Sequence, residues 1–289
     1  MSPLTSEDPR SGAPANDPMV PRFLTIERVV RESADTVTLM LADPHAREGF
    51  APGQFNMLYV FGAGESAISI SGDPARPEHL VHTVRAVGSV THPMAVMKRG
   101  QSIGVRGPFG SGWPIGEAER RKATILLLAG GIGLPPLRPV LYHFLRKRGR
   151  RNRIALLYGA RTPGDLLFTR ELERWRRSGL AEVQVIVDRG EPSWQGRVGV
   201  ITDLLDSPQF DPASTIAMTC GPEVMMRAAA RALLVRGIAA RDIYISMERN
   251  MKCAIGICGH CQFGPSFICK DGPVMSFDHA APLLGVREI

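Results

Sequence analysis

The 289-residue sequence has no long apolar run, no apolar leader segment and few aromatic residues. No stretch approaches the ~20 apolar residues that a helix needs to cross a bilayer, so no membrane span is predicted. Residues 1–20 are rich in Pro, Ser, Asp and Ala, and we expect a disordered tail rather than a targeting segment, in a cytoplasmic protein. Aromatic residues make up 6% of the chain and do not alternate with basic ones, which argues against a nucleic-acid partner.

Cysteine is also scarce, yet four of the five cysteines lie in one segment near the C-terminus. Their spacing is Cys253-x4-Cys258-x2-Cys261-x7-Cys269. A C-x4-C-x2-C segment followed by a fourth cysteine is typical of a ferredoxin-type [2Fe–2S] cluster. Two glycines between the ligands, Gly256 and Gly259, suit a loop that folds tightly around a metal centre. The sequence therefore predicts that these four cysteines bind a metal cluster.

Other uses of four thiols remain open at this point. Cysteine thiolates also form closed zinc sites, but zinc sites usually carry two C-x2-C pairs, and only one is present here. Disulfides are less favoured, because no secretory signal precedes the cysteines. We expect His260, between two cysteines, to shield or tune the cluster, because four thiolates already complete the ligand set.

The middle of the chain carries the pattern of a nucleotide-binding turn. An apolar run begins at Thr124 and leads directly into glycines at 130, 131 and 133. Continuous apolarity is typical of a parallel strand buried on both faces. Pro135 and Pro136 then favour the start of a helix that reaches about Arg148. A strand, a glycine turn and a helix N-terminus together favour anion binding.

Further segments repeat this alternation of strand and helix. We expect strands at 154–158, 183–187 and 215–219, with helices between and after them. Such alternation predicts right-handed crossovers and a doubly wound parallel sheet. Ligands of these sheets bind at the carboxyl ends of the strands, where the turns of this chain lie. By contrast, residues from about 23 to 114 form short β-branched segments separated by Gly and Pro, which predicts an antiparallel β barrel.

Taken together, these motifs resemble the ferredoxin–NADP reductase superfamily. The resemblance rests on Arg106-Gly107-Pro108-Phe109-Gly110, residues 130–137, Tyr158-Gly159-Ala160-Arg161 and Cys220-Gly221-Pro222. The cysteine segment resembles the iron–sulfur flavoprotein branch, which includes the gamma subunit of cytoplasmic nickel–iron hydrogenase or sulfhydrogenase, the equivalent subunit of anaerobic sulfite reductase and the dihydroorotate dehydrogenase electron-transfer subunit. The approach to the cysteines, Met247–Cys253, is most similar to the hydrogenase gamma subunit.

The resemblance implies three domains after the tail. An FAD-binding β barrel would cover residues 21–117, an NAD(P)-binding α/β domain residues 118–246, and a small [2Fe–2S] module residues 247–289. The family's FAD motif Arg-x-Tyr-Ser falls on Ser66-Ala67-Ile68-Ser69, where only Ser69 matches. Arg85 would supply the missing positive charge, unless it is a solvated residue of the barrel rim. A second diphosphate-binding turn would comprise Gly88, Ser89, Val90 and Thr91.

The resemblance also places a nicotinamide nucleotide. Its pyrophosphate would lie against Gly131, Ile132 and Gly133, and Arg161 or Arg189 would contact a 2′-phosphate. Cys220, with Gly221 and Pro222, would stand beside the line of hydride transfer, as the one catalytic candidate. The alternative for Cys220 is a small buried apolar residue at the end of a strand.

The implied function is electron transfer between NAD(P)H, FAD and a [2Fe–2S] cluster, with the chain acting as the diaphorase component of a larger redox complex. Hydrogenase small, large and iron–sulfur subunits are the expected partners. Equivalent subunits of sulfite reductase or dihydroorotate dehydrogenase, and a stand-alone oxygenase reductase, are alternatives. A nucleotide-sensing binding protein with a structural zinc site is the alternative from another class.

Basic residues exceed acidic ones by seven, and they are densest at Arg146–Arg153. We interpret this run as the cationic end of a helix, which is favourable for the helix dipole. Attraction of an acidic partner subunit is a further use of the same charge, since it acts over a Debye length of about 10 Å.

Overall fold

Six antiparallel strands wrap into a barrel in the first part of the chain. The computed structural model describes residues 17–43, 49–146 and 152–286. The barrel strands follow the order β4-β3-β6-β1-β2-β5, and β4 and β5 contact each other to complete the ring. They are β1 (Arg22–Arg31), β2 (Thr36–Ala42), β3 (Phe55–Val60), β4 (Gly64–Ser69), β5 (His79–Arg85) and β6 (Ser102–Phe109). Alternate side chains such as Leu39 and Leu41 fill the interior, and the short helix α1 (Thr91–Ala95) adds Met94 to it.

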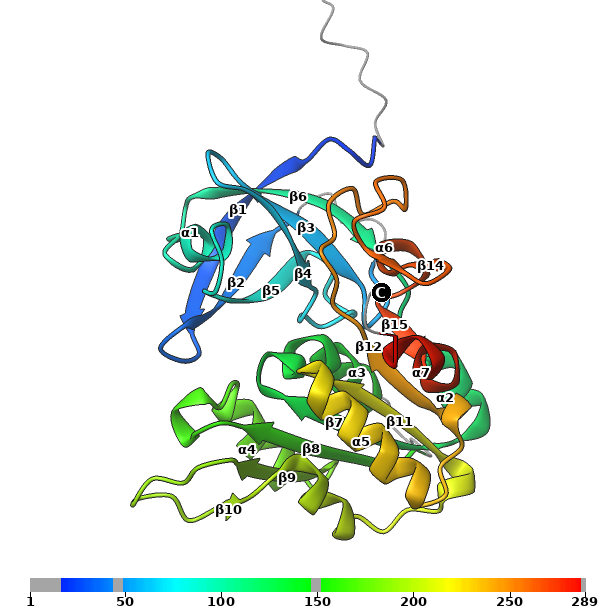
Figure 1. The fold of residues 1–289 in the computed structure, drawn as a ribbon. Coiled ribbons are helices and arrows are strands. Elements are labelled where there is room, and N and C mark those ends of the chain that lie inside the picture. Colours follow the sequence, from blue (N-terminus) through cyan, green and yellow to red (C-terminus); the bar gives the residue numbers. More distant parts are fainter. Residues whose placement is uncertain (1–16, 44–48, 147–151, 287–289) are drawn as a thin grey trace, which may run out of the picture.

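A seven-stranded sheet lies below the barrel in Figure 1, in the order β10-β9-β8-β7-β11-β12-β15. Every neighbouring pair is parallel except β12 and β15. The strands are β7 (Thr124–Gly130), β8 (Ile154–Ala160), β9 (Glu182–Val187), β10 (Arg197–Val198), β11 (Thr215–Cys220), β12 (Ile243–Ser246) and β15 (Val274–Ser276). The 3₁₀ turns are η1 (Gly131–Gly133), η2 (Pro163–Asp165), η3 (Ile201–Asp206), η4 (Pro212–Ser214) and η5 (Ala240–Asp242).

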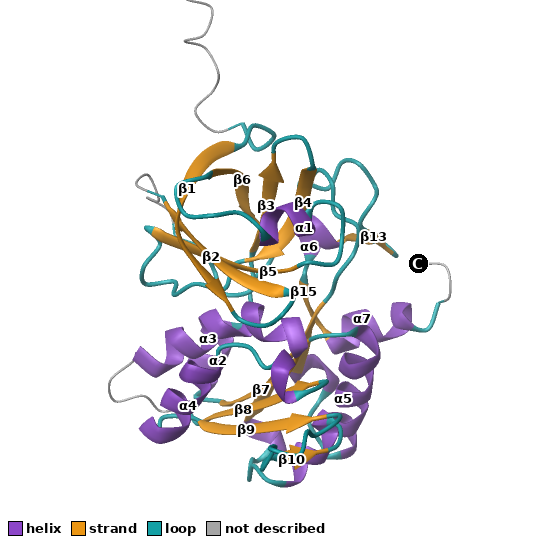
Figure 2. Ribbon diagram, turned by 90° about the vertical axis from the view of Figure 1, so that its left-hand side faces the viewer, coloured by secondary structure: helices purple, strands orange, loops and turns teal. Residues whose placement is uncertain are grey.

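Helices cover both faces of this sheet, which explains the continuous apolar run at β7. Figure 2 shows α2 (Ile115–Arg121), α3 (Leu134–Arg146) and α4 (Thr169–Ser178) on one face, and α5 (Glu223–Val235) and α7 (Phe277–Leu284) on the other. Leu126 and Leu128 pack towards α5, whereas Ile125 and Leu127 pack towards α3. A strand covered on both sides needs apolar side chains at every position.

The C-terminal segment returns to the parallel sheet after it has formed the cysteine region. Two short strands, β13 (Gln262–Phe263) and β14 (Ser266–Phe267), form a hairpin, and the helix α6 (Ile268–Asp271) follows. Strand β15 then pairs antiparallel with β12, and α7 packs on both strands. The cysteine region is thus joined through β15 to the edge of the parallel sheet. The sequence did not predict this connection.

The predicted fold class is confirmed, since a barrel precedes a doubly wound parallel sheet. None of the helices within the described ranges is long and apolar enough to cross a membrane. The expected tail lies mostly outside the described residues, although residues 17–20 are described and Pro18 accepts a hydrogen bond from Arg106. Most of the basic run, residues 147–151, also lies outside them.

Candidate functional site

The turns after β7 and β11 meet at the carboxyl edge of the parallel sheet. Gly133 lies so close to the end of β11 that a Cβ atom there would come within 2.1 Å of the Cys220 carbonyl oxygen. Gly221 adopts a φ of +151°, and a Cβ on it would lie 3.0 Å from the backbone of Gly130. These glycines allow the two turns to touch at the point where the strand order reverses, which is where ligands of such sheets bind.

Gly131 differs from its neighbours because it faces open space. Its φ of +52° suits glycine, and no atom lies within 4 Å of the position of an added Cβ. The turn η1 that begins here leads directly into α3. An open glycine turn at a helix N-terminus is suited to a pyrophosphate. Of the three predicted pyrophosphate residues, Gly131 and Ile132 are half-buried, with open space beside the Gly131 Cα, and Gly133 is a buried packing residue.

Cys220 is the buried last residue of β11. Burial, followed by the negative charge of Glu248, raises the pKa of its thiol to about 12, although a hydrogen bond with Ser246 opposes the rise. The thiol is therefore neutral near pH 7 and is not activated as a nucleophile. The Cys220 carbonyl lies beside Gly133, where the two turns meet, and this position is consistent with either of the two roles considered for the residue.

Arg161 and Arg189 lie side by side at the carboxyl ends of β8 and β9. The Arg189 backbone N–H donates to the Arg161 carbonyl oxygen at 2.9 Å, so the two loops are held together. Both side chains are exposed, and Arg161 lies 3.4 Å from Asp165. The structure thus brings together the two cations predicted to contact the adenosine end of a dinucleotide.

On the barrel, β4 presents a partly covered surface. All six of its residues are half-buried, and the Ser69 carbonyl oxygen is 3.0 Å from Nδ1 of His82. His82 is fully buried, and this burial lowers the pKa of its imidazole to about 4 despite backbone hydrogen bonds at Ser69 and Ile68. Its Nε2 atom faces the amide nitrogen of Asn56 at 3.1 Å. A neutral ring that donates from Nδ1 and accepts at Nε2 satisfies both contacts. The sequence alone does not single out His82, because its burial cannot be read from it.

Arg85 is engaged within the barrel. Its Nε donates to Asp35 Oδ2 at 2.7 Å, and its side chain is 31% exposed. Burial raises the pKa of Asp35, but hydrogen bonds from Arg85, Thr36 and Ser33 outweigh it and lower the pKa overall. A phosphate at Arg85 would thus share the guanidinium with Asp35.

The predicted second diphosphate turn precedes α1. The Thr91 hydroxyl accepts hydrogen bonds from the backbone N–H groups of Val87 and Gly88. Gly88 and Ser89 are exposed and Val90 is half-buried. The structure therefore forms a fixed and accessible turn at these residues.

The four cysteines of the C-terminal segment gather in one loop region as two pairs. Cys253 and Cys258 interact through their side chains, as do Cys261 and Cys269. Cys258 is exposed and the other three are buried. No cysteine in the described ranges forms a disulfide, and no three His, Cys, Asp or Glu side chains there converge as a site for one metal ion. A [2Fe–2S] cluster needs two thiolates for each iron, which is what two pairs supply.

Backbone N–H groups point at these sulfurs. Gly256 N–H donates to Cys269 Sγ at 3.2 Å, and Ile257 N–H donates to Cys253 Sγ at 3.4 Å. Burial raises the pKa of the Cys253 thiol, but backbone hydrogen bonds outweigh it and lower this pKa to about 6. Burial and the interaction with Cys261 raise the pKa of Cys269 to about 12. The backbone N–H groups thus favour negative charge on sulfur, as a metal-bound thiolate requires, whereas burial opposes it at Cys269. His260 faces the Cys258 carbonyl rather than a cysteine sulfur.

A buried arginine joins the cysteine loop to the barrel. Arg106, on β6, has a side chain that is 2% exposed and forms a two-pronged ion pair with Glu65 of β4, at 2.6 and 3.0 Å. Its guanidinium also donates to the carbonyl oxygens of Lys252 and Cys253, both at 3.2 Å. One side chain therefore connects the predicted FAD strand with the first predicted cluster ligand. The sequence showed Arg106 only as part of a motif, since burial cannot be read from it.

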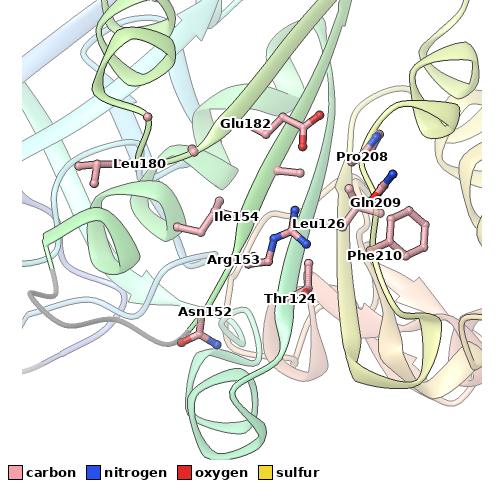
Figure 3. A pocket seen from close by; sticks show the side chains of 13 residues that line it. Thr124, Leu126, Asn152, Arg153, Ile154, Leu180, Glu182, Pro208, Gln209 and Phe210 are labelled. Atoms are coloured by element: carbon pink, nitrogen blue, oxygen red, sulfur yellow. The ribbon is translucent and has the colours of Figure 1, made fainter.

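A separate hollow of about 350 Å³ lies at the opposite edge of the sheet (Figure 3). It is lined by Thr124, Ile154 and Glu182, at the amino ends of β7, β8 and β9, and by Phe210 beyond them. Ligands of doubly wound sheets bind at the other edge. We therefore do not include this hollow in the candidate site.

Comparison with known families matches two parts of the chain. Residues 127–231 match the model of the oxidoreductase NAD-binding domain. Residues 248–280 match the model of the iron–sulfur cluster binding domain of dihydroorotate dehydrogenase B. An NAD-binding domain followed by an iron–sulfur domain defines the class of the protein as an oxidoreductase component that handles electrons.

Whole-chain relatives and solved structures agree with this class. Sulfhydrogenase 2 subunit gamma of Pyrococcus furiosus is 37% identical over 82% of this chain and 86% of the relative. The probable dihydroorotate dehydrogenase B (NAD(+)) electron transfer subunit of Methanocella arvoryzae is 35% identical over 89% of this chain and 90% of the relative. An NADH-dependent reduced ferredoxin–NADP oxidoreductase structure superposes with a TM-score of 0.68 at 24% identity, covering 96% of both chains.

The chain belongs to the ferredoxin–NADP reductase superfamily, in the branch that contains the sulfhydrogenase gamma subunits and the dihydroorotate dehydrogenase B electron transfer subunits. The predicted family, the oxidoreductase class, and the NAD-binding and iron–sulfur domains are therefore confirmed. The domain boundaries and the individual site residues stay predictions.

Proposed function

We propose that this chain is a diaphorase subunit that moves electrons between NAD(P)H, FAD and a [2Fe–2S] cluster. The observation that carries the proposal is the gathering of four thiols into two pairs, with backbone N–H groups aimed at the sulfurs. When bound, a flavin supplies exchange between hydride and single electrons, and an iron–sulfur cluster supplies single-electron relay. The protein positions these groups and excludes water.

We assign the binding roles to residues as follows. Gly131 and the N-terminus of α3 hold the pyrophosphate of the nucleotide, with Arg161 and Arg189 at its adenosine end. Cys220, Gly221 and Pro222 form the wall nearest the nicotinamide. Residues 66–69 and 88–91 hold FAD, with Arg85 shared between a phosphate and Asp35.

The cluster ligands would be divided between the two irons. Cys253 and Cys258 bind one iron, and Cys261 and Cys269 bind the other. Cys258 is exposed while the other three cysteines are buried, so the first pair would hold its iron from the solvent-facing side of the loop. Ile257 beside it is 73% exposed, which gives a partner an apolar contact at the place where electrons would leave.

We propose that the partner complex is of the sulfhydrogenase type, with hydrogenase small, large and iron–sulfur subunits, in the cytoplasm. The 37% identity with two sulfhydrogenase gamma subunits supports this choice. A dihydroorotate dehydrogenase complex is the second candidate, supported by relatives at 34% and 35% identity. Subunits that co-purify with the tagged chain from its own cells would separate these complexes.

The first experiment is an absorbance spectrum of the anaerobically purified protein, with iron, acid-labile sulfide and zinc measured on the same sample. We expect flavin and charge-transfer bands and about two irons per chain, as a binuclear cluster requires. Addition of NADPH or NADH should bleach the flavin band, and the nucleotide that bleaches it faster identifies the preferred donor. A colourless protein with one zinc ion per chain would instead support a nucleotide-sensing protein.

A further inference from the structure

A groove between the barrel and the nucleotide-binding domain is lined by arginines that the electron-transfer function does not use. The groove encloses about 740 Å³. Strands β1, β2 and β5 form its upper wall, and helices α3 and α4 form its lower wall, on the left of the molecule in Figure 2. It lies on the α3 and α4 face of the sheet, whereas the cysteine region packs on the α5 face.

Five exposed arginines surround this groove. They are Arg28, Arg31, Arg76, Arg170 and Arg174. None of them forms an ion pair with a carboxylate of the described ranges, and Arg31 donates only to the Ala34 carbonyl oxygen. Arg170 and Arg174 lie four residues apart on α4, so they share one face of that helix.

The acidic residues of the groove are already engaged. Glu171 holds Arg138 through hydrogen bonds of 2.7 and 2.9 Å. Asp73 pairs with Arg146 at 2.6 Å, and Glu32 accepts hydrogen bonds from Thr38 and from the Phe168 backbone. None of these carboxylates pairs with the five arginines, and six lining arginines against three lining carboxylates leave the groove net positive.

The exposure of these arginines indicates the size of the ligand. A small-molecule site surrounds its ligand with largely buried side chains. Here the five arginines are exposed along the edge of a groove that spans two domains, so only a partner larger than a small molecule would cover them all. Arginine is also enriched at protein interfaces, where its planar head pairs with carboxylates.

The lining also disfavours nucleic acid. Its aromatic residues are Tyr142, which is half-buried, and Phe168, which is buried. The Arg138 guanidinium lies over both rings, 4.2 Å from the centre of Phe168 and 5.1 Å from the centre of Tyr142. These rings are therefore occupied, and stacking of bases needs accessible ring faces.

We infer that an acidic polypeptide segment of a partner protein docks in this groove. Its carboxylates would pair with the arginines of α4 on one side and with those of the barrel on the other. This inference goes beyond the proposed electron-transfer function and does not depend on it, since it requires neither the nucleotide site nor the cysteines.

The test uses a fluorescein-labelled peptide of ten glutamates, with fluorescence anisotropy at low and moderate salt. The variant is the double charge reversal Arg170→Glu/Arg174→Glu. The matched control is Arg231→Glu, an exposed arginine of α5 for which the described residues provide no partner. A decaglutamine peptide and inorganic tripolyphosphate serve as ligand controls, and circular dichroism melts verify that the variants fold.

We expect the acidic peptide to bind, to weaken with salt, and to lose about tenfold or more of its affinity in the double variant, because attraction becomes repulsion. Arg231→Glu should leave binding within about twofold, and decaglutamine should not bind. An equal loss in Arg231→Glu would overturn the inference, because it would show attraction to overall charge. Tripolyphosphate that binds as tightly as the peptide, with the same dependence on Arg170 and Arg174, would overturn it in favour of a small-anion site.

Discussion

At the scale of single residues, two buried polar groups determine how the barrel joins the rest of the molecule. Arg106 connects β4 with the cysteine loop, and His82, in the middle of β5, contacts Asn56 of β3 and Ser69 of β4. Neither is exposed enough to bind a ligand directly. Each controls structure through hydrogen bonds that water cannot replace.

His82 should make stability depend on pH. Its pKa in the folded protein, about 4, lies below the ordinary value of 6.5, so only the unfolded chain binds the proton between these values. Stability should therefore be full above pH 6.5 and fall by up to ~1.4 kcal/mol per pH unit as the pH falls towards 4. Urea unfolding of the wild type and His82→Gln at pH 7, 6 and 5 measures this. The difference between the two proteins should shrink as the pH falls, and a constant difference would contradict the assignment.

Arg106 should control how well the cysteine loop holds a metal. Arg106→Gln removes the charge and leaves Glu65 without its ion pair, which costs roughly 3 kcal/mol or more at a buried site. We expect iron content and thermal stability to fall together, whereas Arg85→Gln, which removes a half-exposed ion pair of the same barrel, should leave iron content unchanged. The measurements are iron per chain and the melting temperature. Full iron content in Arg106→Gln would show that the loop folds without this link.

At the scale of elements, two glycines in the turn after β7 have different structural roles. Gly133 allows close contact with β11, and Gly131 faces open space. Substitution of these two glycines, which are separated by Ile132, should therefore have different outcomes.

Gly133→Ala should be destabilising, because its Cβ would lie 2.1 Å from the Cys220 carbonyl oxygen and the two turns would have to separate. We expect a loss of about 1–3 kcal/mol, as for other overpacked sites. Gly131→Ala should cost only about 1 kcal/mol through its positive φ, but should weaken nucleotide binding more strongly. Chemical denaturation and titration with NADH and NADPH separate the two effects. Equal stability losses in the two variants would refute this division.

Local patterns predicted most elements but not their edges. The strands predicted at 154–158, 183–187 and 215–219 are found as β8, β9 and β11, because apolar and β-branched runs are local signals. The pairing of β15 with β12 joins residues far apart in sequence and depends on hydrogen bonds that no short pattern encodes. The spacing predicts the four cysteines as ligands, and that assignment stays a prediction, whereas Arg106 and His82 could not be predicted, because their roles depend on burial.

At the scale of the whole molecule, Arg138 connects the two large domains. It lies on α3, donates to the Ser71 carbonyl oxygen of the barrel segment at 2.9 Å, and pairs with Glu171 of α4. Its side chain is 11% exposed. The relative position of the barrel and the nucleotide site therefore depends in part on one buried guanidinium.

Arg138→Gln should loosen this connection without unfolding either domain. We expect a single calorimetric transition in the wild type to separate into two in the variant, with an overall loss of about 3 kcal/mol, because Glu171 loses its ion pair and keeps only the hydrogen bonds from Tyr142. Arg231→Gln, on the far helix α5, should keep one transition. A single, uniformly shifted transition in Arg138→Gln would show that other contacts are enough to hold the domains together.

The return of the chain through β15 has a further consequence for how this architecture can be rearranged. A strand that terminates a sheet also shields the hydrogen-bonding groups of its neighbour, and β15 does so for β12. Truncation of the chain at residue 247 would leave β12 as an exposed edge strand, which is prone to pair with strands of other molecules. The cysteine region therefore cannot be exchanged between proteins on its own. Any graft of it onto another reductase must carry β15 and α7 along with the cysteines.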